Sequence, residues 1–236
     1  MGAELPGVAS GLAILYEDDT LIFINKPPGI VVQQRMFEPD EPFLHDLVER
    51  HTSPAYLMQR LDRGTSGVIF FSKSSAMNVR LTRQFERKRI TKRYLAICEG
   101  ELAETQTIDA PIARIGAIKF GVRDHGKRSI THVRALSAKP SGSLVDITLE
   151  TGRTHQIRVH LSAIGHPLAG DWLYGESSAV RPMLHAAELE MLHPLTGQTL
   201  RVAAPAPADF LEEAERRGLP SRAEDMDGLG MRHVSR

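Results

Sequence analysis

QRLDRGTSGVIFFSK, residues 59–73, combines a polar loop and an apolar strand in one short stretch. Its second half, VIFFSK, is a continuous apolar run of strand length with polar turns on both sides, which predicts a buried strand. Its first half places one carboxylate, Asp62, between two arginines in a loop that Gly64 and Gly67 interrupt. Loops at strand ends often carry binding and catalytic residues. The stretch therefore predicts a strand whose preceding loop can carry chemistry.

The segments on the N-terminal side of this strand predict a hairpin and a short helix. In GLAILYEDDTLIFINKPPG, residues 11–29, two apolar strands flank a tight acidic turn at Asp18 and Asp19. Two prolines and a glycine follow the second strand and predict a rigid loop. FLHDLVERH, residues 43–51, has the apolar spacing of an amphipathic helix.

The second half of the chain predicts further antiparallel strands and two helices. Strands are expected within 92–100, 131–138 and 143–150, and a pair of strands within 183–205. One helix is expected over 157–164, with Ile157, Leu161 and Ile164 on one face, and another over 208–218. This mixture favours an α+β fold with a mixed, largely antiparallel central sheet and flanking helices over a doubly wound parallel sheet. We expect a single catalytic domain over 12–218, an N-terminal tail over 1–11 and a mobile C-terminal tail over 219–236.

Composition narrows the class of protein. The 236 residues contain 42% hydrophobic and 25% charged residues, which suits a chain that buries a full core. No stretch approaches the roughly 18 apolar residues that cross a bilayer, and the first residues lack the pattern of a signal peptide, so we expect a cytoplasmic protein without a membrane partner. The one cysteine, Cys98, has no disulfide partner and lies in an apolar segment that predicts a buried strand.

The net charge is zero, but one segment is strongly cationic. Between positions 79 and 94 the chain has one acid, Glu86, and seven cations: Arg80, Arg83, Arg87, Lys88, Arg89, Lys92 and Arg93. Part of this segment predicts a helix that Ser74 or Ser75 can cap, with Met77, Leu81 and Phe85 on its apolar face and the arginines on the other. Such a cationic segment is either a solvated helix face or a contact surface for a polyanion.

Asp62 allows a catalytic and a structural interpretation. Neighbouring arginines favour the ionised carboxylate, which can then act as a nucleophile or as an electrostatic stabiliser. The same residues can equally form an ion-pair network that holds the loop. The Arg-Asp-Arg pattern alone leaves both interpretations open.

Five blocks of the sequence resemble the RluA-type family of RNA pseudouridine synthases. QRLDRGTSG resembles the catalytic motif usually written HRLDRxTSG, and Lys92 to Tyr94 resembles the K-x-Y motif. The other three blocks are TGRTHQIRVH with GHPLAGDWLYG (151–160 and 165–175), NKPPGIVV (25–32) and LHAAELEMLHPLTG (184–197). The chain departs from the pattern at Gln59, where histidine is usual, and at Met191, where another apolar or aromatic residue is common.

The resemblance implies an isomerase that converts uridine in ribosomal or transfer RNA to pseudouridine without a cofactor or metal. Asp62 would be the catalytic aspartate, Tyr94 the aromatic residue against the flipped uracil, and Arg153 the partner of Asp62. Whether Asp62 attacks the sugar, attacks the base or abstracts a proton stays open. The three side chains are expected within about 12 Å of each other, because one nucleotide must touch all of them.

Further residues follow from the same motifs. Substrate contacts are expected from Arg60, Arg63, Thr65, Lys92, His155 and Gln156, and RNA-backbone contacts from Arg80, Arg83, Arg87, Lys88, Arg89 and Arg93. A monomer is expected, since no heptad pattern is present.

Two other classes of protein deserve comparison. A zinc hydrolase would use the histidines of the second half, but their spacing matches no common zinc motif: His155, His160, His166, His185 and His193. Capping or packing at the start of a helix is the expected role of His155. The other class is a non-catalytic RNA-binding protein that retains the fold; the absence of Asp62 or Tyr94 would favour it, and both are present.

Overall fold

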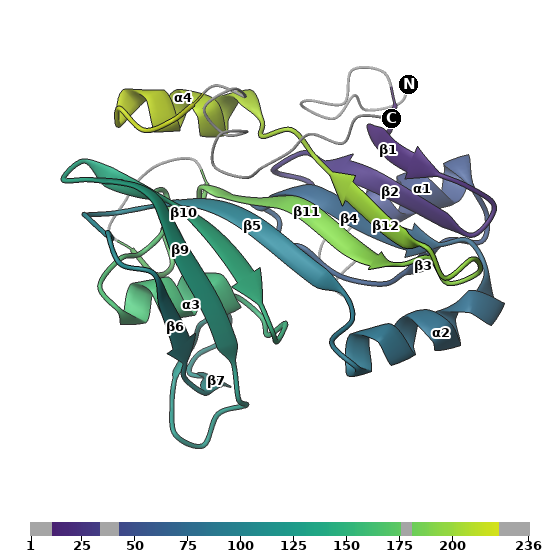
Figure 1. Cartoon of the computed structure of the whole chain (residues 1–236), viewed down its shortest axis with the longest axis horizontal. Coiled ribbons are helices and arrows are strands. Elements are labelled where there is room, and N and C mark those ends of the chain that lie inside the picture. The colour runs from purple at the N-terminus through teal and green to yellow at the C-terminus, as the bar shows by residue number, and fades with distance from the viewer. Residues whose placement is uncertain (1–10, 34–42, 176–180, 222–236) are drawn as a thin grey trace. The chain divides into compact units, whose positions relative to one another are not determined.

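The computed structural model describes residues 11–33, 43–175 and 181–221, which form two compact units (Figure 1). Unit 1 comprises the chain up to Ile90 together with Ala186–Pro205, and unit 2 comprises Thr91–His185 and the chain from Ala206 onward. The predicted single domain over 12–218 therefore stays a prediction. Most of the two predicted tails lies outside the described residues, but Leu219 is buried and its amide donates to the carbonyl of Ala214 at 2.9 Å.

Unit 1 is a sheet with two helices. Its elements are β1 (Ile14–Glu17), β2 (Leu21–Lys26), α1 (Leu44–His51), β3 (Tyr56–Leu57), β4 (Ser66–Ser72), α2 (Ser75–Glu86), β11 (Leu184–Leu192, of which 186–192 belong to this unit) and β12 (Thr199–Ala203). The strand order is β1-β2-β4-β11, with β12 beside β11 and β3 beside β4. β1 and β2 pair antiparallel, which confirms the predicted hairpin.

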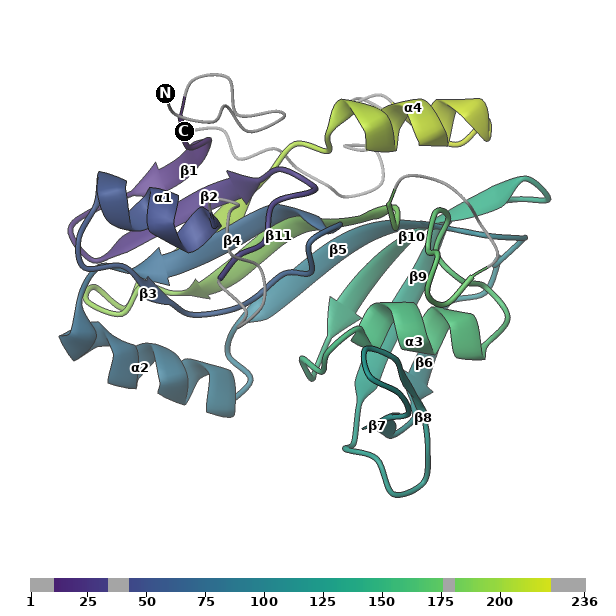
Figure 2. The ribbon, with the colours of Figure 1, turned by 180° about the vertical axis from the view of Figure 1, so that it is seen from behind.

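Both faces of this sheet are covered, which explains the uninterrupted apolar run of β4. Phe70 points to the face that α2 covers, and its ring stacks on Phe85 with centroids 6.2 Å apart. Phe71 points to the opposite face, where its ring lies 5.9 Å from His45 of α1. Figure 2, seen from behind, shows α1 in front of the strands of unit 1. Since successive strand residues alternate between faces, a strand buried on both sides needs apolar residues at every position.

Unit 2 contains antiparallel strands and two helices. Its elements are β5 (Thr91–Cys98), β6 (Gln106–Asp109), β7 (Ile112–Arg114), β8 (Phe120–Val122), β9 (Ile130–Lys139), β10 (Gly142–Leu149), α3 (Gln156–Ala163) and α4 (Ala208–Arg216). The order is β5-β10-β9-β6, and β7 pairs with β8 separately. The long β9-β10 hairpin confirms the predicted antiparallel strands on either side of Pro140, while β6, β7 and β8 were not predicted.

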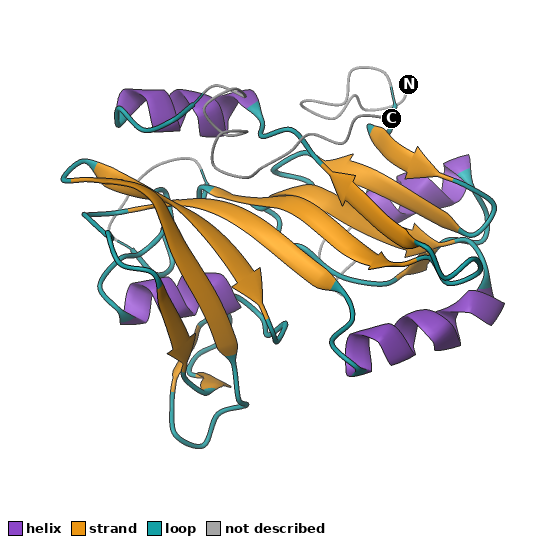
Figure 3. Ribbon diagram, in the orientation of Figure 1, coloured by secondary structure: helices purple, strands orange, loops and turns teal. Residues whose placement is uncertain are grey.

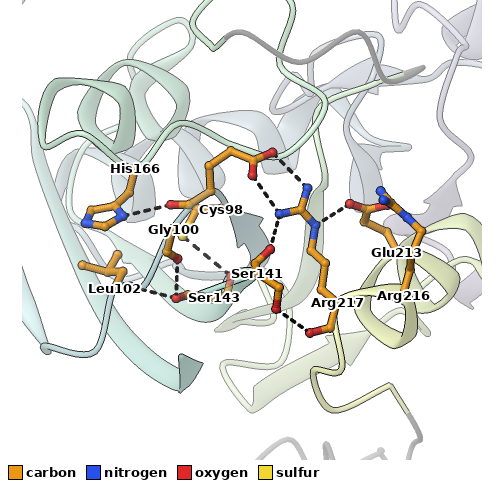
Figure 4. A network of polar contacts seen from close by, with 10 residues as sticks. Cys98, Gly100, Leu102, Ser141, Ser143, His166, Glu213, Arg216 and Arg217 are labelled. Atoms are coloured by element: carbon orange, nitrogen blue, oxygen red, sulfur yellow. Dashed lines mark hydrogen bonds and ion pairs between the residues drawn. The ribbon is translucent and has the colours of Figure 1, made fainter. Parts of the chain in front are cut away.

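A polar network attaches the end of α4 to the sheet of unit 2 (Figure 4). The Arg217 guanidinium contacts both carboxylate oxygens of Glu99, at 2.8 and 2.9 Å, and donates to the carbonyl of Ser141 at 2.7 Å. Cys98 is fully buried in β5 beside this network, as predicted, and burial raises the pKa of its thiol to about 12.

Helices and strands alternate irregularly along the described chain (Figure 3). β10 pairs antiparallel with β5 and β9, and β2 pairs antiparallel with β4. The fold class is therefore α+β, as predicted. Within the described ranges, no helix has the length and apolar character required to span a membrane.

Candidate functional site

The predicted site residues divide between the two units. Arg60, Asp62, Arg63 and Thr65 lie in unit 1, on the loop between β3 and β4. Lys92, Tyr94, Arg153, His155 and Gln156 lie in unit 2, on β5 and on the segment that leads into α3. The structure brings the residues of each set together, and the prediction that Asp62 shares a cleft with Tyr94 and Arg153 stays a prediction.

The loop of Asp62 is a tight turn that places the carboxylate at the start of a buried strand. The amide of Thr65 donates to the carbonyl of Asp62 at 3.0 Å. Leu61 and Thr65 are buried on either side, while Asp62 is half-buried and Arg60 is exposed. A carboxylate held by its own backbone turn, with its neighbours anchored in the core, can be presented to a substrate without an ordering cost on binding.

Arg63 links this loop to the loop that follows β2. Its Nε donates to the carbonyl of Gly29 at 2.9 Å, and the Gly29 amide donates to the carbonyl of Arg63 at 2.8 Å. Gly29 has a φ of +90°, a conformation that glycine adopts at no steric cost. The Nε of Arg63 thus supports the loop, and the substrate contact predicted for its exposed side chain stays a prediction.

Lys26 supports the loop of Asp62 and the loop that follows β2, a role that the sequence did not predict. Its side chain is fully buried, and its ammonium donates to the carbonyls of Pro27 (2.9 Å), Ile30 (3.0 Å) and Arg63 (3.1 Å). A buried lysine is costly unless its charge is hydrogen-bonded, and three carbonyls supply those bonds here. The signal in the sequence was a lysine placed at the end of an apolar strand, directly before two prolines.

Gln59 and Gly67 are the first and last residues of the QRLDRGTSG motif, and both hold it against neighbouring strands. Gly67 has a φ of +107°, and a Cβ at this position would lie 2.1 Å from the carbonyl oxygen of Ala186 in β11. Only glycine therefore allows β4 and β11 to approach this closely. Gln59, which stands where histidine is usual, donates from Nε2 to the carbonyl of Val68 at 3.3 Å. The glutamine thus supports the loop through the backbone of β4.

In unit 2, β5 carries Lys92 and Tyr94 on one face, because they are two residues apart on a strand. Tyr94 is buried opposite Ile147 of β10. The Lys92 ammonium lies beside the loop that precedes α3, 3.3 Å from where a Cβ on Gly152 would stand. Burial lowers the pKa of Lys92. The K-x-Y motif and the TGR segment are therefore neighbours in space.

Arg93 points to the opposite face of β5 and is already engaged. Its Nε and one terminal nitrogen contact the two oxygens of Asp146 at 2.7 and 3.0 Å, and Arg134 contacts the same carboxylate at 2.8 Å. A contact of Arg93 with the RNA backbone would have to compete with this bidentate ion pair. The pairing of Arg93 with Asp146 therefore does not favour the predicted role.

Gln156 organises the loop that carries Arg153. Its Oε1 accepts from the hydroxyl of Thr151 (2.7 Å) and the amide of Arg153 (3.0 Å), and its Nε2 donates to the carbonyl of Ile130 (2.9 Å) and the hydroxyl of Thr131 (3.0 Å). With its side-chain amide fully used and 2% of its surface exposed, Gln156 is a support of the loop, and this position does not favour the predicted substrate contact.

Arg153 itself is exposed at the tip of this loop. Its Nε donates to the carbonyl of Arg128 at 3.4 Å, a long bond that leaves the end of the guanidinium toward solvent. The backbone of Arg153 is thus fixed by Gln156, while its side chain is more loosely held. Such an arginine can reorient toward an anionic group.

His155 packs as predicted, but it does not cap the helix with its side chain. It occupies the N-cap position of α3 in the left-handed region, at a φ of +57°, and makes no side-chain cap bond. Its ring lies between Phe120 and Tyr174 with centroids 5.7 and 5.6 Å away, and its Nδ1 is 2.9 Å from the Tyr174 hydroxyl. A non-glycine residue in this strained conformation is a feature of functional sites.

A buried ion pair that the sequence analysis did not identify supports the same region. Arg158 of α3 and Asp171 form two hydrogen bonds of 2.7 Å, and both side chains are almost completely buried. The Arg158 guanidinium also lies 5.0 Å from the centre of the Tyr174 ring. Because Tyr174 contacts His155, the pair fixes the environment of the N-terminus of α3.

The predicted cationic helix is α2. Leu81 is buried and Met77 and Phe85 pack on the core, which confirms the predicted apolar face. Ser74 is the N-cap residue, but its side chain makes no cap bond. The hydroxyl of the nearby Ser72 donates to the Ser74 carbonyl at 2.9 Å. The remaining predicted RNA contacts in this segment are exposed: Arg80, Arg83, Arg87, Lys88 and Arg89.

Arg80 differs from the other exposed cations of this segment because its guanidinium donates to the carbonyl of Pro194 at 2.9 Å.

The histidines of the second half are used in packing and hydrogen bonds. His160 bonds the Thr131 hydroxyl and the Ala110 carbonyl, and His193 bonds Asp18. Burial lowers the pKa of His160. Among the described residues, no group of three or more His, Cys, Asp or Glu side chains could hold a metal ion.

Comparison with known proteins finds relatives that are named as RNA pseudouridine synthases. The family model described as RNA pseudouridylate synthase matches residues 20–163. The chain is 39% identical over 217 residues to ribosomal large subunit pseudouridine synthase D of Nitrosomonas europaea, covering 84% of this chain and 63% of that relative's length. It is 40% identical over 212 residues to the RNA pseudouridine synthase YhcT of Bacillus subtilis, covering 84% of this chain and 70% of YhcT.

Solved structures agree in fold. Human RNA pseudouridylate synthase domain containing 1 matches with a TM-score of 0.71 and 29% identity over 86% of this chain and 87% of that chain. Human RNA pseudouridylate synthase domain containing 4 matches with a TM-score of 0.74 at 24% identity, covering 88% and 94%. The matched range contains the Asp62 loop, Tyr94 and the Arg153 loop. The chain therefore belongs to the RNA pseudouridylate synthase family.

Proposed function

We propose that this chain isomerises uridine to pseudouridine in large-subunit ribosomal RNA, with Asp62 as the essential carboxylate. The match to the family model over the segment that contains Asp62, Tyr94 and Arg153 carries this proposal. Several matched relatives are named for the large ribosomal subunit, which favours ribosomal over transfer RNA. We also propose that residues 12–218 act together as one catalytic domain, in a cytoplasmic monomer.

The proposed reaction breaks the N1–C1′ bond of uridine and joins C5 to C1′, so a C–N bond is exchanged for a C–C bond within one nucleotide. Asp62 can act covalently at carbon or stabilise an electron-poor sugar. Tyr94 can stack on the uracil, and its hydroxyl can take part in the proton transfer at C5. Arg153 would pair with the Asp62 carboxylate. These three residues are the proposed catalytic set.

A uridine inside a helix or stacked loop must be turned out of the stack, which costs a few kcal/mol. Contacts to flanking phosphates can offset that cost, and the exposed cations Arg83, Arg87, Lys88 and Arg89 at the end of α2 are the proposed contacts. Arg60, exposed beside Asp62, is proposed to fill the stack during flipping. Binding should therefore weaken steeply as salt is raised.

Tritium release from ribosomal RNA labelled at uridine C5 tests the proposal. The parent chain should release tritium, and Asp62→Asn, which keeps shape and polarity, should release none while binding RNA normally. Asp19→Asn is the matched control, because Asp19 is exposed in the β1-β2 turn and should leave the rate unchanged. Equal release by parent and Asp62→Asn would refute the role of Asp62. Binding without release by the parent would identify a non-catalytic RNA-binding protein.

A further inference from the structure

The turn after α3 exposes the chain's single tryptophan. Trp172 has 61% of its surface exposed, although tryptophan is strongly buried on average. The residue before it, Asp171, is completely buried and bonded to Arg158. Asp171 Oδ1 accepts the amides of Leu173 (3.1 Å) and Tyr174 (3.2 Å), so the turn is fixed on both sides of the indole. An exposed indole is therefore presented on a rigid support.

The hairpin of β7 and β8 is attached to the same turn. The amide of Phe120 in β8 donates to the Tyr174 hydroxyl at 2.9 Å, and the Lys119 ammonium lies 5.8 Å from the centre of the Tyr174 ring. This hairpin exposes Ile115 and Ile118. Half of the six exposed large apolar side chains in the described ranges thus belong to the hairpin and the turn: Ile115, Ile118 and Trp172.

The hairpin and the segment that follows β8 are also cationic. Between positions 114 and 128 the chain has one acid, Asp124, and five exposed cations: Arg114, Lys119, Arg123, Lys127 and Arg128. Arg128 pairs with Asp109 at 3.2 Å, and the ion pair is exposed. An apolar partner protein would leave this positive charge without a counterpart, whereas the phosphates of a nucleic acid match it. Exposed aromatic and apolar side chains beside cations are typical of surfaces that bind unpaired RNA.

We propose that Trp172 stacks on an unpaired base next to the target uridine, while the cations of the β7-β8 hairpin contact the adjoining phosphates. This surface rests on the proposed function and extends it, because it assigns a single-stranded flank to the RNA substrate. Its position supports the assignment. Tyr174 contacts His155, and the backbone carbonyl of Arg128 accepts a hydrogen bond from Arg153, so the hairpin and turn adjoin the unit 2 part of the candidate site.

Since Trp172 is the only tryptophan, its fluorescence reports on this turn alone. Asp62→Asn, used to prevent turnover, is titrated with a single-stranded oligouridylate of twelve nucleotides and with a blunt RNA duplex of the same length. Stacking should quench the indole with the single strand and not with the duplex. Trp172→Ala should bind the single strand about 5-fold to about 100-fold more weakly, the range expected for loss of one stacked base, and Trp172→Phe should recover most of the affinity.

Turnover separates this proposal from the proposed function. With Asp62 intact, Trp172→Ala should raise the KM for ribosomal RNA and leave kcat nearly unchanged. Tritium release by the parent, combined with an unquenched indole and an unaltered KM in Trp172→Ala, would overturn the stacking surface and leave the enzyme activity standing. Quenching without tritium release would support the surface and refute the activity.

Discussion

Replacing Lys26 by methionine should destabilise unit 1 and slow the proposed reaction. Methionine fills similar volume, but it cannot donate to the three carbonyls that the ammonium reaches. A buried acceptor without a partner costs about 1–3 kcal/mol. The bonds to Pro27 and Arg63 are only partly buried, so water can replace the ammonium there, whereas the bond to Ile30 is buried. We therefore expect a loss of about 3 kcal/mol in the free energy of unfolding.

The same substitution should loosen the loop of Asp62, because the ammonium holds the carbonyl of the next residue, Arg63. Misplacement of a catalytic group by about 1 Å can cost about 100-fold in rate. A fall of roughly 10-fold to 100-fold in tritium release is expected under conditions where the variant is fully folded.

Urea titration followed by circular dichroism measures the stability, with Lys73→Met as the matched control. Lys73 also makes two hydrogen bonds in unit 1, both 2.8 Å, to Glu17 and to the Asp18 carbonyl, but it lies near the surface, so its loss should cost less than about 1 kcal/mol. If Lys26→Met and Lys73→Met unfold at the same urea concentration, the buried ammonium does not stabilise the loops. An early-unfolding Lys26→Met with full turnover would refute the link to Asp62.

Three further substitutions test other supports. Gly67→Ala should lower the melting temperature far more than Gly165→Ala, because both glycines have positive φ but only a Cβ at Gly67 would meet the backbone of Ala186; equal melting would contradict the close approach. Burial opposes ionisation of Asp18, but hydrogen bonds from Tyr16, Thr20 and Leu21 prevail and hold its pKa well below the usual range. The ionised Asp18 therefore stabilises the fold above the unfolded pKa of about 3.9. Asp18→Asn should be less stable than the parent at pH 7, and the difference should shrink as the pH falls below that value; a constant difference across an acid titration would refute this linkage. Gln156→Leu should cost about 2–4 kcal/mol in urea unfolding and slow turnover, and unchanged values of both would show that its four bonds are dispensable.

Local patterns predicted those elements whose side chains repeat with the period of their secondary structure. The continuous run of β4, the spacing of Leu81 in α2 and the β9-β10 hairpin were all visible, since their burial follows directly from sequence spacing. The short strands β6, β7 and β8 were not visible. Strands of three or four residues show no measurable periodicity, and β6 is defined by its backbone bonds to β9.

The candidate site was predictable through motifs, but its supports were not. Asp62, Tyr94 and Arg153 could be named because their neighbours in sequence form recognisable blocks. The role of Lys26 depends on a carbonyl 37 residues away, and that of Arg158 on a carboxylate 13 residues away. For the same reason, the sequence did not show the bonds that Gln156 and Arg93 make within the fold, and their predicted contacts with RNA stay predictions. Sequence spacing cannot show which polar groups the fold brings together.

The buried thiol of Cys98 is a natural probe of local opening in unit 2. Its strand, β5, also carries Tyr94, and because the sulfur is buried, a thiol reagent can reach it only when the structure around Cys98 opens. Under native conditions, the rate of thiol labelling would therefore give the free energy of opening of this part of unit 2 without any introduced probe. Adding RNA and following the change in labelling rate would measure, in the same units, how strongly the bound nucleotide holds the strand closed.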